Sequence, residues 1–97
     1  NLLVERVEAT RILRATRGAF ADDGGLLEPE VRAAGEAAMV ELERVMAGDD
    51  HLAIRAAVEG LDLATKPFAQ ARMNRAIGAQ LHGKTLDEIE RAAEGHR

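Results

Sequence analysis

The chain has no cysteine, tryptophan or tyrosine, and its 97 residues include only two phenylalanines and two prolines. Without cysteine it can form neither a disulfide nor a thiolate-ligated zinc or iron–sulfur centre of its own. The lack of cysteine also fits a reducing cytoplasm, which is the location we expect. Any core must be built from Leu, Ile, Val, Met and Ala, and this composition favours close contacts between helices. At this length we expect one domain at most.

The charge balance and the short hydrophobic runs also argue against two classes of partner, nucleic acids and membranes. The formal net charge is −4 and the sequence pI is about 5.3, so no nucleic-acid partner is expected. No apolar run approaches transmembrane length, and we expect no membrane partner. The run Leu2-Leu3-Val4 is too short for a signal peptide. Because the chain begins without Met and inside a periodic pattern, we interpret it as an excised fragment.

Basic residues gather near the N-terminus. They predict a solvated helix face, with contact to an acidic neighbouring surface as the alternative. These residues are Arg6, Arg11, Arg14 and Arg17.

Residues 1–22 predict one helix with two apolar faces. A second apolar face, made of Leu3, Val4 and Val7, lies near the start of the helix. A helix free in water needs only one buried face, so we expect neighbours on two sides. The segment Asp22-Asp23-Gly24-Gly25 then ends the helix. The main stripe at helical spacing consists of Leu2, Ala9, Leu13, Thr16 and Phe20, widened by Ile12 and Ala19.

A second helix is predicted from Glu28-Pro29-Glu30 to a stop at Gly48. Proline suits the first turn of a helix, and the two carboxylates favour the positive end of its dipole. The glycine suits the C-terminal end. The predicted apolar stripe is Val31, Ala34, Gly35, Ala38, Met39, Leu42, Val45 and Met46.

A third helix is expected to begin after Asp49 or Asp50, either of which can cap it. Pro67 lies inside its pattern and predicts a kink or a break near residues 63–66. The apolar face of this helix carries Ile54, Val58, Leu61, Thr65 and Phe68, with Ala57 and Ala64 beside them.

Together these segments predict an all-α protein, an antiparallel three-helix bundle with up-down-up topology. Residues 28–82 would complete the bundle around the first helix, and residues 83–97 would form a C-terminal tail. Gly83 is expected to end ordered helix. Thr85-Leu86-Asp87-Glu88 has the pattern of a capping box, so the tail is expected either to form a short helix through Ala93 or to be disordered.

No arrangement of residues predicts catalysis. The acidic pairs Asp22/Asp23, Asp49/Asp50 and Asp87/Glu88 fall at predicted helix ends, where capping explains them. A site made of His82, Asp87 and His96 would match no metal-ligand spacing. The glycines lack the strand-to-helix setting of a phosphate-binding loop. We therefore predict no catalytic, cofactor-binding or metal-binding residues in this chain, and no enzyme activity of its own.

Several short motifs follow one another along the chain: residues 7–13, the turn Ala47-Gly48-Asp49-Asp50, the set Asp62, Thr65, Phe68, Ala69, Arg72 and Met73, and the ending at residues 81–89. Their order and separations resemble the C-terminal helical lid of DnaK-family heat-shock chaperones, in the HscA branch that serves iron–sulfur cluster assembly. Two departures stand out. The general family pattern has an acidic latch residue just before a pair of aliphatic residues, whereas Thr10 and Arg11 precede the pair Ile12-Leu13 here. Pro67 is also not expected from the family.

The resemblance implies that residues 1–97 are a single lid subdomain, with residues 1–22 as the distal part of the long lid helix. Such a lid closes over the β-sandwich peptide-binding domain of the same parent chain. The parent would be an ATPase that binds ATP and acts, with a J-type co-chaperone, on an unfolded or scaffold-protein client.

The second apolar face of the first helix is the candidate surface for lid contact or for self-association, so a homodimer of the excised chain is also expected. The alternative to the lid is a free-standing helical interaction or dimerisation module, which would use this surface for an outside protein or for itself. The candidate residues are Leu3, Val4, Val7, Arg11 and Arg14.

Overall fold

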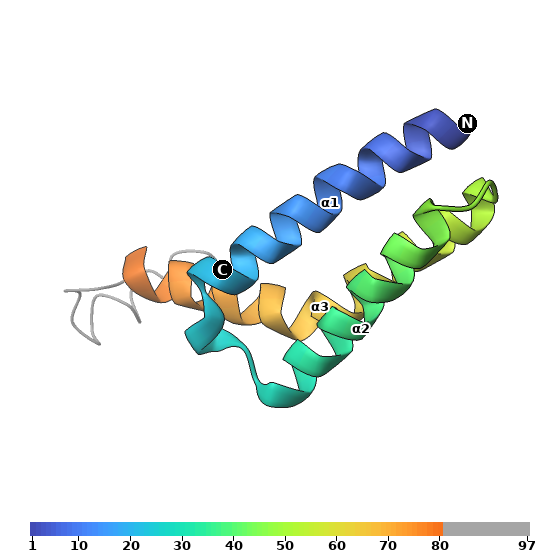
Figure 1. The fold of residues 1–97 in the computed structure, drawn as a ribbon. Helices are drawn as coiled ribbons and strands as arrows, with labels where there is room; N and C mark the ends of the chain where they lie inside the picture. Colours follow the sequence, from blue (N-terminus) through green and yellow to red (C-terminus); the bar gives the residue numbers. More distant parts are fainter. Residues whose placement is uncertain (81–97) are drawn as a thin grey trace, which may run out of the picture.

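The structure, a computed structural model, describes residues 1–80, and these residues form three antiparallel helices (Figure 1). Helix α1 spans Leu2–Asp22, α2 spans Pro29–Met46 and α3 spans His51–Gln80, with a short 3₁₀ turn, η1, at Gly24–Leu26. The predicted all-α, up-down-up bundle is therefore confirmed. The predictions for Gly83, the capping box at residues 85–88 and the tail at residues 83–97 lie outside the described residues.

The helix boundaries follow the predicted capping chemistry. The side-chain oxygen of Asn1 accepts hydrogen bonds from the backbone N–H groups of Leu3 and Val4. Asp50, rather than Asp49, caps α3, because its carboxylate accepts from the N–H groups two and three residues later, at 3.0 and 3.2 Å. These bonds satisfy amide groups that the first turn of a helix leaves without partners. Pro29 is the first residue of α2, as the sequence predicts.

The core is formed by the predicted apolar stripes of all three helices. Met39 and Leu42 of α2 belong to one buried cluster with residues of α1 and α3, and Leu42, Ile54 and Leu61 are the largest fully buried side chains. One assignment was wrong: Ala34 is exposed, because it lies at the edge of the α2 stripe, turned away from the side that faces the core. The buried hydrophobic residues are Ala9, Leu13, Phe20, Met39, Leu42, Ile54, Leu61 and Phe68.

Two aromatic rings close the end of the bundle near the α1–α2 connection. The rings of Phe20 and Phe68 meet edge to face, with centroids 5.1 Å apart and planes at 89°. Phe20 also lies directly against the backbone of α2 at Gly35. A Cβ atom added at that glycine would stand 2.7 Å from the tip of the Phe20 ring. The close approach of α1 to α2 at this level therefore depends on the missing side chain.

Helix α3 continues through Pro67 without interruption. Proline lacks the N–H group that would bond to the carbonyl of Leu63, one turn earlier. Pro67 is exposed, while the next residue, Phe68, is anchored in the core. Leu61 and Phe68 are buried on either side of the proline, so core packing holds the helix across it. The expected break is wrong, and the expected kink stays a prediction.

Candidate functional site

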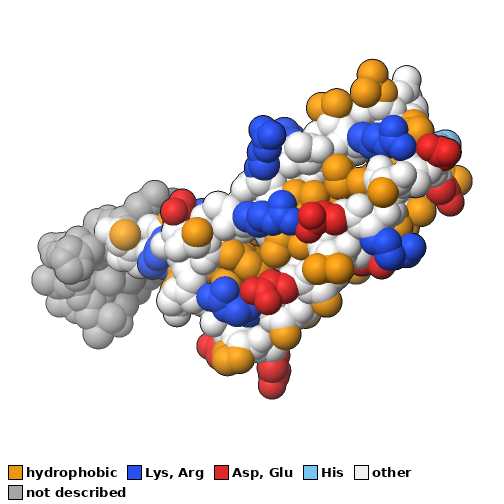
Figure 2. Space-filling view, in the orientation of Figure 1, with side chains coloured by type: hydrophobic (Ala, Val, Ile, Leu, Met, Phe, Trp, Pro, Cys, Tyr) orange, Lys and Arg blue, Asp and Glu red, His pale blue; other side chains and the backbone are white. Residues whose placement is uncertain are grey.

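The outer face of α1 is the most exposed apolar surface on this helix. Leu3, Val4 and Val7 are 70, 60 and 62 % exposed. At 3.6 residues per turn they point away from the side on which Ala9 and Leu13 enter the core. Figure 2 shows hydrophobic side chains at the N-terminal end of α1, with basic side chains further along the same edge of the molecule. The prediction that this helix has two apolar faces is confirmed.

The four N-terminal arginines do not act as one cluster. Arg6 reaches the turn between α2 and α3, where its guanidinium donates to the carbonyl oxygens of Met46 at 3.2 Å and Gly48 at 2.6 Å. Carbonyl groups at the C-terminal end of a helix lack partners within that helix, so Arg6 caps α2 from α1. Arg17 forms an ion pair with Glu43 of α2. These two arginines therefore hold α1 in the bundle.

Arg11 and Arg14 belong instead to the outer face. Arg11 pairs with Glu8, one turn earlier on the same helix, and the hydrogen bond from its guanidinium lowers the pKa of the Glu8 carboxyl. Within residues 1–80, Arg14 makes no ion pair, and its side chain lies at the surface. The outer face, which comprises Leu3, Val4, Val7, Arg11 and Arg14, is thus apolar at the N-terminal end and basic further along.

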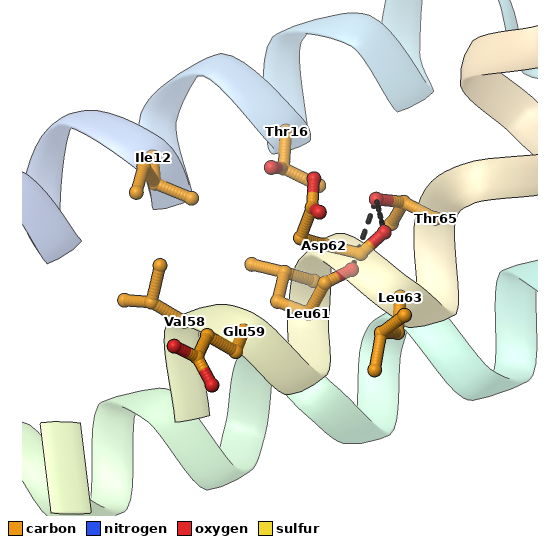
Figure 3. A pocket seen from close by; sticks show the side chains of 8 residues that line it. All are labelled: Ile12, Thr16, Val58, Glu59, Leu61, Asp62, Leu63 and Thr65. Carbon is orange, nitrogen blue, oxygen red and sulfur yellow. Dashed lines mark hydrogen bonds between the residues drawn. The ribbon is translucent and has the colours of Figure 1, made fainter. Parts of the chain in front are cut away.

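A groove with a volume of about 520 Å³ runs between α1 and α3 on another side of the molecule (Figure 3). Ile12 of α1 and Val58 of α3 point toward each other, and Asp62 extends from α3 toward Thr16 of α1. We call this hollow the α1–α3 groove. Its lining residues are Ile12, Thr16, Val58, Glu59, Leu61, Asp62, Leu63 and Thr65.

The α1–α3 groove combines an apolar floor with negative charge. The hydroxyl of Thr65 donates to the carbonyl of Leu61 at 2.9 Å, so that hydroxyl is already satisfied within α3. Glu59 and Asp62 supply the carboxylates, and neither makes an ion pair with another residue in the described part of the chain. Asp62 belongs to the motif that carries the family resemblance, but the described residues give its side chain no partner.

An ion cluster that the sequence interpretation missed fastens α1 to α3. Asp23, only 9 % exposed, accepts hydrogen bonds from Arg72 and Arg75, each at 2.7 Å. The bond from Arg75 does most to lower the pKa of the Asp23 carboxyl, partial burial opposes that shift, and Arg72 adds to it. The sequence predicted that Asp23 caps a helix end, but its side chain makes no capping bond to η1. The available signal was two arginines three residues apart, which share one helix face.

None of the groups of His, Asp and Glu side chains within residues 1–80 could hold a metal ion through three or more ligands. Every buried side-chain nitrogen or oxygen in this range has a hydrogen-bond partner, as is usual in folded proteins. None of the helices in this range is long and apolar enough to cross a membrane. The geometry offers surfaces for contact with other molecules.

Comparison with known proteins agrees with the motifs. No family model matches the chain. It is 48 % identical over 88 residues to a chaperone protein HscA homologue from Cupriavidus taiwanensis, a match that covers 91 % of this chain and 14 % of that protein. Similar matches are the HscA homologues of Cupriavidus metallidurans, at 46 % identity with the same coverage, and of Azoarcus sp., at 45 % identity over 89 % of this chain and 14 % of the relative. The chain therefore belongs with the HscA-type chaperones and corresponds to about one seventh of the length of these relatives.

Proposed function

We propose that this chain is the helical lid of an HscA-like chaperone, which closes over the peptide-binding β-domain of the parent protein and slows release of the client. The observation that carries the proposal is the outer face of α1. A helix already anchored in a bundle still presents three large aliphatic side chains that are at least 60 % exposed. Exposed apolar residues grouped on one face indicate a surface that another structure covers.

The architecture suits a rigid cover. Arg6, Arg17 and Asp23 connect α1 to α2 and α3 at several points along its length. The outer face would therefore approach or leave a neighbouring domain as one body. A cover that buries surface only in the bound state acts mainly on the dissociation rate of the client. As part of the same proposal, the parent protein is a cytoplasmic ATPase that serves protein folding or iron–sulfur cluster assembly.

The test is peptide release from a parent chaperone that contains this segment. Dissociation of a fluorescent peptide would be followed for the intact protein and for a form truncated just before Asn1. We expect at least a tenfold faster release from the truncated form, with a much smaller change in the association rate. Equal dissociation rates in the two forms would exclude the lid role.

The second candidate function is a helical interaction module that docks onto an outside protein. The same exposed aliphatic residues support it, because they fit any apolar partner. The release experiment separates the two functions. A docking module would leave peptide dissociation unchanged, whereas a lid would change it.

A further inference from the structure

Two surfaces of this chain are complementary in charge and in polarity. The outer face of α1 presents aliphatic side chains followed by Arg11 and Arg14. The α1–α3 groove presents an aliphatic floor followed by Asp62. Within residues 1–80, neither Arg14 nor Asp62 has an ion-pair partner. An apolar helix face with an unpaired cation fits an apolar groove with an unpaired carboxylate.

The spacing of apolar and charged residues along the outer face also matches the spacing along the groove. Val7 precedes Arg11 by one helical turn and Arg14 by two. On α3, Val58 precedes Asp62 by one turn in the same chain direction. A helix laid parallel to α3 with Val7 beside Val58 would bring both arginines within about one turn, roughly 5 Å along the axis, of Asp62.

The groove is open to such an occupant. Figure 3 shows the side chain of Asp62 crossing the space between α3 and α1 above the apolar residues. Glu59 and Leu63 lie at the edge and point away from α1. An incoming aliphatic side chain would rest against Ile12 and Val58, and a neighbouring guanidinium would reach the Asp62 carboxylate. Arginine suits this role because its planar donors match a carboxylate.

We propose that the α1–α3 groove binds the outer face of α1 from a second copy of this chain, with Val7 on the apolar floor and Arg14 paired to Asp62. The outer face of one copy contacts the α1–α3 groove of the other, so the interface joins two different surfaces. Each copy therefore carries both halves of the interface, and the assembly either closes as a pair or extends in a series. The inference uses only the surfaces of this chain and does not depend on the lid function.

The experiment compares the association of the 97-residue chain with that of charge-reversed variants by sedimentation velocity over a range of concentrations. We expect wild-type chain to gain mass as concentration rises. Asp62→Arg and Arg14→Asp should each weaken association about tenfold or more, because like charges then face each other. The double variant, Asp62→Arg with Arg14→Asp, should recover at least part of the association, since the reversed face fits the reversed groove.

Controls separate this contact from general charge effects and from misfolding. Glu36→Arg makes the same charge change on an exposed α2 site outside the groove, and should associate like wild type. Far-UV circular dichroism should show equal helix content in all variants. A wild-type chain that stays monomeric, or an Asp62→Arg chain that associates as strongly as wild type, would overturn the proposal. Neither result would affect the peptide-release test of the lid function.

Discussion

A single missing side chain sets how closely α1 approaches α2. Gly35 is buried, and a Cβ at this position would stand 2.7 and 3.0 Å from two atoms of the Phe20 ring and 3.4 Å from a methyl group of Thr65. The ring cannot easily move aside, because its other contacts include the edge-to-face pair with Phe68. Sequence patterning placed Gly35 on the buried stripe but could not show that an aromatic ring lies against it, because that contact joins residues far apart in the chain.

Replacing Gly35 by alanine should destabilise the bundle despite the better helix propensity of alanine. Overpacking costs about 1–3 kcal/mol, and the propensity gain offsets up to about 1 kcal/mol of that. Gly18→Ala is the matched control, since the added Cβ meets nothing within 4 Å on the exposed side of α1. We expect that variant to be about 0.5–1 kcal/mol more stable than wild type. Urea unfolding measures both values, and equal gains in the two variants would disprove the tight contact at Gly35.

Asp23 should make stability depend on pH in the acidic range. Its two arginine partners hold the pKa of the folded carboxyl below its ordinary value of 3.8. A group with a depressed folded pKa stabilises the protein fully above its unfolded pKa, and this contribution is lost as the pH falls through the folded value. Wild type should therefore lose more thermal stability between about pH 6 and pH 2.5 than Asp23→Asn does.

Other carboxylates titrate in both proteins, so the informative quantity is the difference between the two pH profiles. Asp22→Asn is the neighbouring control, because Asp22 is exposed and makes no ion pair with the described residues. Its profile should follow that of wild type. If Asp23→Asn also followed wild type, the bonds to Arg72 and Arg75 would not persist in solution.

Features of the helices that depend on neighbouring residues could be predicted from the sequence. Features that depend on contacts between distant residues could not. The start of α2 at Pro29 follows from the proline and the acidic residues around it. The continuity of α3 through Pro67 could not be predicted from the chain, because it depends on which side of the helix faces water and on Phe68 being held by Phe20. Propensity favours an interruption there, and tertiary packing overrides it.

Two adjacent aspartates at the start of α3 should differ in their contribution to stability. The carboxylate of Asp50 accepts two backbone N–H groups, whereas that of Asp49 is almost fully exposed and lies 3.5 Å from the guanidinium of Arg6. Asp50→Ala should cost about 1 kcal/mol of unfolding free energy, and Asp49→Ala clearly less. Chemical denaturation of the two variants side by side tests this order. Equal losses would mean that the cap is shared between the two residues.

For the molecule as a whole, the sequence predicted the two-faced character of α1 but not the second surface beside it. The outer face was visible because Leu3, Val4 and Val7 do not fit the core stripe. The α1–α3 groove was not, because its walls come from residues about fifty positions apart that only the fold brings together. Asp62 and Val58 have no unusual local sequence setting, so their shared groove could be recognised only in the structure.

Substitutions on the two faces of α1 should have different effects. A change on the core face should lower stability, and a change on the outer face should alter peptide release in a parent chaperone. Leu13→Ala removes a core side chain and should cost the bundle about 2–4 kcal/mol, measured by urea unfolding of this chain. Val7→Ser changes a side chain that is 62 % exposed and should leave the unfolding free energy within about 0.5 kcal/mol of wild type. If the outer face meets the peptide-binding domain, Val7→Ser in the parent should still speed peptide release several-fold. A stable Val7→Ser protein with unchanged release would mean that the lid, if it closes, does so through some other surface.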